Sequence, residues 1–302
     1  MISGKDLKLG FIGFGELASG IARELKKEGL RTIWAYDKVL SARSDLEKAM
    51  REKAEEEGVG LVESPEKLVS QVQVFLSAVI PSEALRVAQV FAPLLKIDQI
   101  YADLNSCSPQ LKVAAGKEMV RSGASYVDVG VVGGVAIQGH RIPCLACGDA
   151  AEKLKSILTP FGMNIRVIDG PVGTAARMKM LRSVVLKGIE ALLLEMLTAA
   201  KEYGLEEEMM DSVAKTFDQG KFKDYSNMLM TTHTMHAGRR LAEMEMVVET
   251  VKESGIKPFL SEGIVNFFDH SVGLELDKHF KGNVPEDYRE VTSAIRKLSH
   301  RL

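Results

Sequence analysis

A short apolar run that passes directly into a glycine-rich turn, and then into an amphipathic helix, constrains this chain more than any other feature. Residues 9–12 have the composition of a buried strand, and Gly13-Phe14-Gly15-Glu16-Leu17-Ala18 follows with the spacing GxGxxA. In this spacing the first glycine permits a tight turn, the second lets backbone approach a pyrophosphate, and the small third residue lets the helix pack on the strand. The segment predicts the first unit of a dinucleotide-binding βαβ fold, with an ordinary glycine turn as the alternative. The candidate cofactor-binding residues of this turn are Gly13, Phe14, Gly15, Glu16 and Leu17.

From residue 7 to about 168, short β-rich runs alternate with amphipathic stretches. Such alternation predicts parallel βαβ units. The expected strands are 9–13, 32–36, 74–79, 99–103, 126–131 and 143–148, and the expected helices between them include 18–27, 44–57 and 82–95. This half of the chain therefore predicts an α/β fold, a Rossmann-type doubly wound parallel sheet.

The pattern changes after Gly170. One long helical stretch covers residues 172–203 and stops at Gly204, a suitable helix C-cap, and helical segments dominate from there to the end of the chain. Breaks are expected near Gly220, at 255–258 and at 282–285. We therefore expect two domains, a dinucleotide-binding domain at 1–170 and an all-α domain at 171–302, to which the family resemblance described below adds substrate binding and dimerisation.

The second expected strand ends at Asp37, about 20 residues after the glycines, where a carboxylate can bind the ribose hydroxyls of NAD and repel the 2′-phosphate of NADP. Lys38 and Arg43 follow closely and offer positive charge to such a phosphate. The cofactor is expected to be NAD or NADP, with NAD favoured. The alternative for Asp37 is a carboxylate that only supports the turn.

Composition removes several classes of function. Lys and Arg number 39 against 41 Asp and Glu, so the basic excess of a dedicated nucleic-acid binder is missing. The most apolar stretch, residues 184–200, is interrupted by Lys187, Glu190 and Glu195, and no membrane span is expected. Three cysteines do not build a disulfide framework, and the start of the chain lacks the pattern of a signal peptide. We expect a cytoplasmic protein.

Three ordered motifs resemble the β-hydroxyacid dehydrogenase family, which includes 3-hydroxyisobutyrate and 6-phosphogluconate dehydrogenases. The glycine-rich start is the first. Asp128-Val129-Gly130-Val131-Val132-Gly133-Gly134 resembles the substrate loop, and the run from Gly170 to Lys179, GPVGTAARMK, resembles the catalytic motif. The second half is similar to a branch whose phosphogluconate-dehydrogenase-like C-terminal domain has no known function.

The resemblance implies roles for individual residues. Lys179 would be the general acid/base that exchanges the hydroxyl proton, the alternative being a solvated helix lysine. Ser183, one turn further along the same helix, would position the substrate or the lysine, and Asn105 lies in the expected cofactor loop. Gly133 and Gly134 would offer backbone N–H groups to the substrate. The family's helical domain also implies a homodimer.

Three departures from the family pattern bear on the substrate. Val132 replaces the substrate-loop serine, and Leu186 stands where phosphogluconate dehydrogenases have an acidic glutamate, which argues against decarboxylation of 6-phosphogluconate. Arg239-Arg240 replaces a Lys-Asp pair, and Arg239 keeps a cation suited to an anionic substrate.

Two further groups invite a metal interpretation. Cys144 and Cys147 are expected as buried strand residues because no second pair completes a zinc site. His233 and His236 are three residues apart on an expected helix, where a metal site, a place in the substrate pocket and a polar helix face are all open. No metal is assigned.

The sequence as a whole predicts an NAD(P)-dependent oxidoreductase that transfers hydride between nicotinamide and a small, anionic hydroxy acid. The alternatives are a reductase of imines or other carbonyl compounds, and a dinucleotide-binding dimer without turnover.

Overall fold

The computed structural model describes residues 7–41 and 44–299. Arg43, one of the candidate phosphate-binding residues, lies outside the described residues. The contacts divide the chain between Val184 and Val185, inside a long helix, and the two units are described separately. The domain boundary that the sequence predicts, after residue 170, lies before this division, in the turn that precedes the long helix. That boundary stays a prediction.

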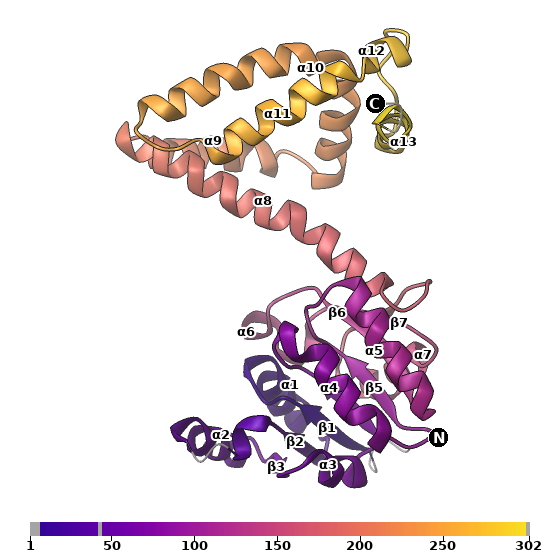
Figure 1. The fold of residues 1–302 in the computed structure, drawn as a ribbon. Coiled ribbons are helices and arrows are strands. Elements are labelled where there is room, and N and C mark those ends of the chain that lie inside the picture. Colours follow the sequence, from indigo (N-terminus) through magenta and orange to yellow (C-terminus); the bar gives the residue numbers. More distant parts are fainter. Residues whose placement is uncertain (1–6, 42–43, 300–302) are drawn as a thin grey trace. The chain divides into compact units, whose positions relative to one another are not determined.

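The N-terminal unit is built on an eight-stranded sheet in the order β3-β2-β1-β4-β5-β6-β7-β8 (Figure 1). Its central five-strand order, with β1 between β2 and β4, is that of a doubly wound dinucleotide-binding sheet. The strands are β1 Lys8–Ile12, β2 Thr32–Tyr36, β3 Gly60–Leu61, β4 Val74–Ser77, β5 Ile100–Asp103, β6 Ser125–Val131, β7 Cys144–Cys147 and β8 Ile165–Val167.

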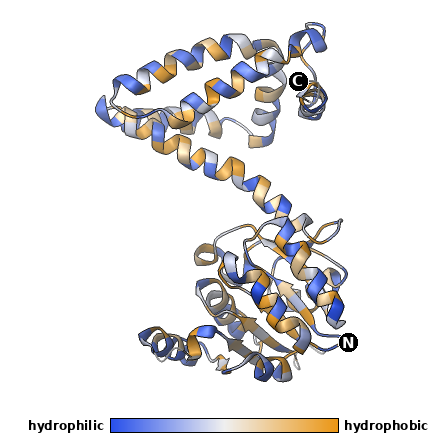
Figure 2. Ribbon diagram, in the orientation of Figure 1, coloured by the Kyte–Doolittle hydropathy of each residue, from blue (hydrophilic) through white to orange (hydrophobic). Residues whose placement is uncertain are grey.

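Helices cover both faces of this sheet because successive strand residues point to opposite sides. Phe11 packs on one face in register with Ala35 and Leu76, whereas its neighbour Ile12 packs on the other face with Phe75. Apolar strands between amphipathic helices are visible in Figure 2. The first face is covered by α1 Glu16–Lys27 and α7 Ala151–Leu158, and the second by α3 Pro65–Gln71, α4 Ala84–Phe91 and α5 Pro109–Ser122. Two further helices, α2 Asp45–Glu56 and α6 Val135–Gln138, complete the connections between strands.

All six expected strands are present, and the sheet is parallel as expected except where β7 pairs with β6. Strand β7 pairs antiparallel with β6, with Val131 opposite Cys144. A parallel connection needs a crossover of a dozen or more residues with a substantial helix, and only the four-residue α6 and a 3₁₀ turn lie between these strands. Strands β3 and β8 were not expected, because two and three residues are too few to show a pattern.

The helix α8 Thr174–Glu202 begins in the N-terminal unit and continues into the C-terminal one. The C-terminal unit then contains α9 Glu206–Asp218, α10 Phe222–Glu253, α11 Phe259–Gly273, α12 Leu276–His279 and α13 Tyr288–Ser299. The helix breaks expected from the glycine and proline positions are confirmed. Gly204, the expected C-cap, follows α8 with a φ of 68°. In the described part of the chain, no helix is both long and apolar enough to cross a bilayer.

Candidate functional site

Gly13 makes the turn between β1 and α1, and no other residue fits there. Its φ is 84°, a conformation that favours glycine, and an added Cβ would lie 2.5 Å from the carbonyl oxygen of Ala78. Its N–H donates to the Tyr36 carbonyl at 2.8 Å, which joins the turn to the end of β2. The Phe14 side chain is buried beneath the turn.

Gly15 occupies the N-cap position of α1, and an added Cβ there would meet nothing within 4 Å. The space over the helix start is therefore open, and α1 directs its first N–H groups and the positive end of its dipole towards it. Glu16 is exposed in the first turn of α1 and Leu17 is half-buried against the core. A side chain at position 15 would occupy the space that a pyrophosphate needs, so the residues present fit a dinucleotide.

Asp37, at the end of β2, supports the glycine turn directly. Its carboxylate accepts hydrogen bonds from the backbone N–H groups of Phe14, at 2.9 Å, and Val39, at 3.0 Å. Asp37 therefore supports the turn, which was the alternative to a role in cofactor binding. The same side chain lines a cavity of about 310 Å³ together with Gly13 and Gly15, where a ribose would find it. Both roles can coexist because each carboxylate oxygen has two lone pairs.

Lys38, the next residue, lines the same cavity and forms an ion pair with Glu83, with 3.4 Å between Nζ and Oε2. Glu83 lies just before α4 and also accepts hydrogen bonds from Arg86. The sequence analysis did not identify Glu83 or Arg86, since nothing in the spacing connects them with Lys38.

Asn105 lies in the loop after β5, and its side chain joins that loop to the end of β4. The Oδ1 atom accepts from the Val79 N–H at 2.6 Å, and Nδ2 donates to Ser77 Oγ at 3.0 Å. Asn105 is buried, and its own N–H donates to the Asp103 carboxylate at 2.9 Å. Its side chain thus ties the loop after β5 to the end of β4, where Val79 lines the cavity.

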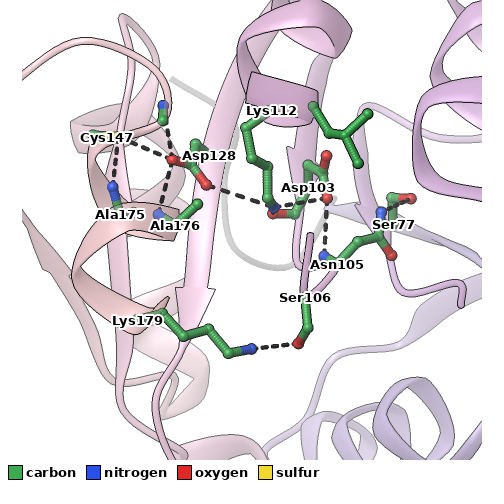
Figure 3. A network of polar contacts seen from close by, with 12 residues as sticks. Ser77, Asp103, Asn105, Ser106, Lys112, Asp128, Cys147, Ala175, Ala176 and Lys179 are labelled. Atoms are coloured by element: carbon green, nitrogen blue, oxygen red, sulfur yellow. Dashed lines mark hydrogen bonds and ion pairs between the residues drawn. The ribbon is translucent and has the colours of Figure 1, made fainter. Parts of the chain in front are cut away.

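Lys179 lies two turns into α8, half-buried, and its Nζ donates a hydrogen bond to Ser106 Oγ in the loop after β5 (Figure 3). Burial lowers the pKa of Lys179, and the nearby positive charge of Lys112 lowers it further. The structure therefore brings the predicted acid/base residue to the predicted cofactor loop, 73 positions away in the sequence.

Behind this pair lies a buried ionic network that the sequence analysis missed. Lys112 on α5 places Nζ 2.8 Å from the Asp103 carboxylate and 3.5 Å from that of Asp128, and all three side chains are at most 1% exposed. Tyr126 donates its hydroxyl to Asp103 at 2.7 Å. Two aspartates on neighbouring strands, Asp103 opposite Asp128, with a lysine in the helix that connects those strands, were the signal for this network.

Asp128 also anchors the helix that carries Lys179. Its Oδ2 atom accepts from the N–H groups of Gly173, at 3.0 Å, and Ala176, at 3.2 Å (Figure 3). A carboxylate at the positive end of a helix stabilises that helix and satisfies N–H groups that have no intrahelical partner. Asp128 thereby ties α8 to β6 and, through Lys112, to the cofactor loop.

The predicted substrate-loop motif, residues 128–134, begins inside β6, and only its last three residues follow the strand. Gly134 is the N-cap of α6, and an added Cβ on Gly133 would lie 2.2 Å from Gln138 Oε1, so the loop is tight at that point. Ser183 donates its hydroxyl to the Lys179 carbonyl at 3.0 Å, one turn back along α8. That hydroxyl still has its two lone pairs for a ligand.

Arg239 belongs to the C-terminal unit, where it is exposed on α10 and forms an ion pair with Glu243 at 2.7 Å. On the same helix, His233 is buried with its Nε2 2.7 Å from Ser271 Oγ, whereas His236 is exposed. Among the described residues, no cluster of three or more His, Cys, Asp or Glu is suited to hold a metal ion.

Cys144 and Cys147 are buried in β7, as the sequence predicted. Burial raises the pKa of the Cys144 thiol to about 12, which makes a reactive thiolate unfavourable at neutral pH. These cysteines therefore belong to the packing of the sheet.

Each half of the chain matches a known protein family. A family model described as the NAD binding domain of 6-phosphogluconate dehydrogenase matches residues 8–170, and one described as a domain of unknown function (DUF1932) matches residues 200–271. An uncharacterized 28.5 kDa protein of Methanothermus fervidus is 31% identical, over 87% of this chain and 98% of that protein. The 2-(hydroxymethyl)glutarate dehydrogenase of Eubacterium barkeri is 25% identical, over 93% of this chain and 85% of that enzyme.

Solved structures are also similar to this chain over most of its length. A conserved protein of unknown function, whose structure reveals similarity with 3-hydroxyacid dehydrogenases, is 32% identical with a TM-score of 0.59, covering 92% of this chain and all of that one. An imine reductase from Myxococcus stipitatus in complex with NADP⁺ has a TM-score of 0.75 over 95% of this chain and 99% of that one, at 16% identity. At that identity the second likeness concerns the fold alone.

Proposed function

The chain belongs to the 3-hydroxyacid dehydrogenase-like family of NAD(P)-binding oxidoreductases, and from that membership we propose that it oxidises or forms a small, anionic hydroxy acid with Lys179 as general acid/base. The observation that carries the proposal is the hydrogen bond from Lys179 to Ser106, which holds a half-buried amine against the cofactor loop. A lysine with a lowered pKa can exchange a proton near neutral pH, as an alcohol–carbonyl reaction requires.

The nicotinamide, when bound, accepts or donates the hydride. The residues of this chain transfer the proton that accompanies the hydride. Neutral Lys179 Nζ takes the hydroxyl proton of the substrate in the direction of oxidation, and the resulting ammonium polarises the carbonyl in the direction of reduction. Ser106 accepts a hydrogen bond from Nζ in both protonation states, and so orients it throughout.

For the dinucleotide, we assign Gly13, Phe14, Gly15, Glu16 and Leu17 to the pyrophosphate, and Asp37 with Lys38 to the adenosine ribose. Asn105 would fix the loop beside the nicotinamide. The open space at Gly15 and the cavity that Asp37 lines support these assignments. The carboxylate of Asp37 also supports NAD as the preferred cofactor.

For the substrate, we assign the backbone of Gly133 and Gly134, the hydroxyl of Ser183 and the guanidinium of Arg239. A cation and free N–H groups suit a carboxylate. With Val132 in the substrate loop and Leu186 on α8, the chain lacks the side chains of a phosphogluconate decarboxylase, so we propose that oxidation ends without loss of CO₂. The three free thiols suit a cytoplasmic location.

The test is to compare Lys179→Ala with Lys201→Ala, a control in the last turn of the same helix. We expect Lys179→Ala to lose turnover of 3-hydroxy acids by at least about a hundredfold while NADH titration shows unchanged binding, because general acid/base groups contribute about 10²–10⁴-fold. Lys201→Ala should keep both properties. Turnover retained in Lys179→Ala would rule out this role, and a wild-type chain that reduces only imines, or nothing, would favour the alternative functions.

A further inference from the structure

The cavity beside the glycine turn contains two acidic and two basic side chains, and their pairing determines what charge a ligand meets there. Asp37 and Lys38 come from the end of β2, whereas Glu83 and Arg86 come from the segment after β4 and the start of α4. The four formal charges sum to zero. The groups are separate in the sequence and meet only around this cavity.

Glu83 holds both cations through one oxygen. Its Oε2 atom accepts from Arg86 Nε at 3.0 Å and lies 3.4 Å from Lys38 Nζ, and the second Arg86 nitrogen also donates to it. The Glu83 side chain is 24% exposed, against 61% for Arg86 and 63% for Lys38, so the carboxylate is the more enclosed partner. Arg86 lowers the pKa of Glu83, which keeps that carboxylate charged.

These charges matter because NAD and NADP differ at one place. A 2′-phosphate brings close to two negative charges, and the proteins that bind it tightly provide cations whose hydrogen bonds it can take. Here Lys38 and Arg86, which line the same cavity as Asp37, already share the carboxylate of Glu83. The ribose hydroxyls of NAD are neutral and do not need a positive charge that is free of Glu83.

We propose that Glu83 sets the preference of this protein for NAD over NADP by engaging Lys38 and Arg86. The inference rests on the proposed position of the adenosine ribose beside Asp37, and adds to it a residue that contributes no contact to the ribose itself. Asp37 repels the 2′-phosphate. Glu83 pairs with the two cations whose charge would otherwise offset that repulsion.

The test is a pair of fluorescence titrations, with NADH and with NADPH, on wild-type protein and on Glu83→Gln. Wild-type protein should bind NADH more tightly. Glu83→Gln leaves two cations against one carboxylate in the cavity, and we expect the ratio of the NADPH Kd to the NADH Kd to fall by roughly tenfold. The gain should weaken as salt increases, because the groups are exposed.

Two further variants show whether the effect arises at this cluster. Glu118→Gln removes the same kind of pair, with Arg121 three residues on, from the exposed face of α5, and should change the ratio less than about twofold. Adding Arg86→Ala to Glu83→Gln should return the ratio towards the wild-type value.

The outcomes separate this inference from the proposed function. Binding of both nucleotides with a ratio that Glu83→Gln does not change, or wild-type preference for NADPH, would overturn the role of Glu83 and leave the dehydrogenase proposal standing. Failure of the wild-type chain to bind either nucleotide would overturn the placement of the dinucleotide, and the role of Glu83 with it.

Discussion

The environment of Lys179 combines groups that act on its proton in opposite directions. Burial in α8 is the largest influence and disfavours the charged form, and the buried ammonium of Lys112 acts in the same direction. The thiols of Cys144 and Cys107 act in the other direction but more weakly. The balance lowers the pKa of Lys179, so a larger fraction of the amine is neutral near pH 8 than for an ordinary lysine, whose pKa is about 10.4.

This balance predicts the pH dependence of the amine itself. We expect the rate at which acetic anhydride labels Lys179, followed by mass spectrometry, to rise at lower pH than for a lysine-containing reference peptide in the same tube. Because the neutral amine is also the proposed base for oxidation, the rate of oxidation should increase with pH through the same range, and the rate of reduction should decrease. Labelling of Lys179 and the peptide with the same pH profile would contradict the lowered pKa.

At the scale of elements, one carboxylate connects three of them. Asp128 in the middle of β6 accepts from two N–H groups at the start of α8 and pairs with Lys112 on α5. The lysine in turn meets Asp103 at the end of β5. Helix α5 can present Lys112 there because Ser108 caps its first turn, with Pro109 at its first position. The helix with Lys179 and the loop after β5 therefore share one buried support.

Removing this support should destabilise the protein strongly. Asp128→Ala removes one of the two buried carboxylates beside Lys112 and the acceptor of two N–H groups at the start of α8, and we expect the free energy of unfolding, from urea titrations, to fall by about 3 kcal/mol or more. Asp128→Asn keeps an acceptor oxygen and should lose less. Asp149→Ala, at an exposed position after β7, is the matched control and should change little. A fall in Asp128→Ala no larger than that of the control would contradict the anchoring role.

At the scale of the molecule, the C-terminal unit leaves much apolar surface uncovered. No residue of α9 is buried, and large apolar side chains such as Leu194 on α8, Met246 on α10 and Phe259 on α11 are more than half exposed. An apolar cavity of about 510 Å³ lies among α8 to α11. Exposed apolar surface of this extent typically marks an interface. We propose that a second copy of this chain covers it, as the length of the helical half also suggests.

The expected mass in solution is therefore twice the 33.1 kDa of one chain, measured by light scattering during size-exclusion chromatography. Leu194→Glu places a charge on the apolar surface and should shift the protein towards monomer. Leu46→Glu makes the same change at a 70% exposed leucine on α2 and should leave the mass unchanged. A wild-type protein that elutes with the mass of one chain would contradict the dimer.

The sequence by itself determined the class of fold and six of the eight strands of the sheet. Local spacing was sufficient for the glycine turn, for the six strands that were expected and for the breaks between the C-terminal helices, because hydrophobic period and helix-ending residues act over a few positions. The order of three motifs was sufficient for the family. The direction of β7 needed one more consideration, the length of the connection after β6.

Only the tertiary structure decided which side chains meet. Three side-chain pairs join residues on different elements: Lys179 with Ser106, Lys112 with Asp128, and Glu83 with Lys38. Periodicity shows that a residue is on a helix or at a strand end, but not which distant residue faces it. A lysine in a short amphipathic helix resembles a solvated one until the sheet places two aspartates against it. The charges of this site follow from those contacts, because burial and pairing, which set a pKa or a ligand preference, exist only in the folded chain.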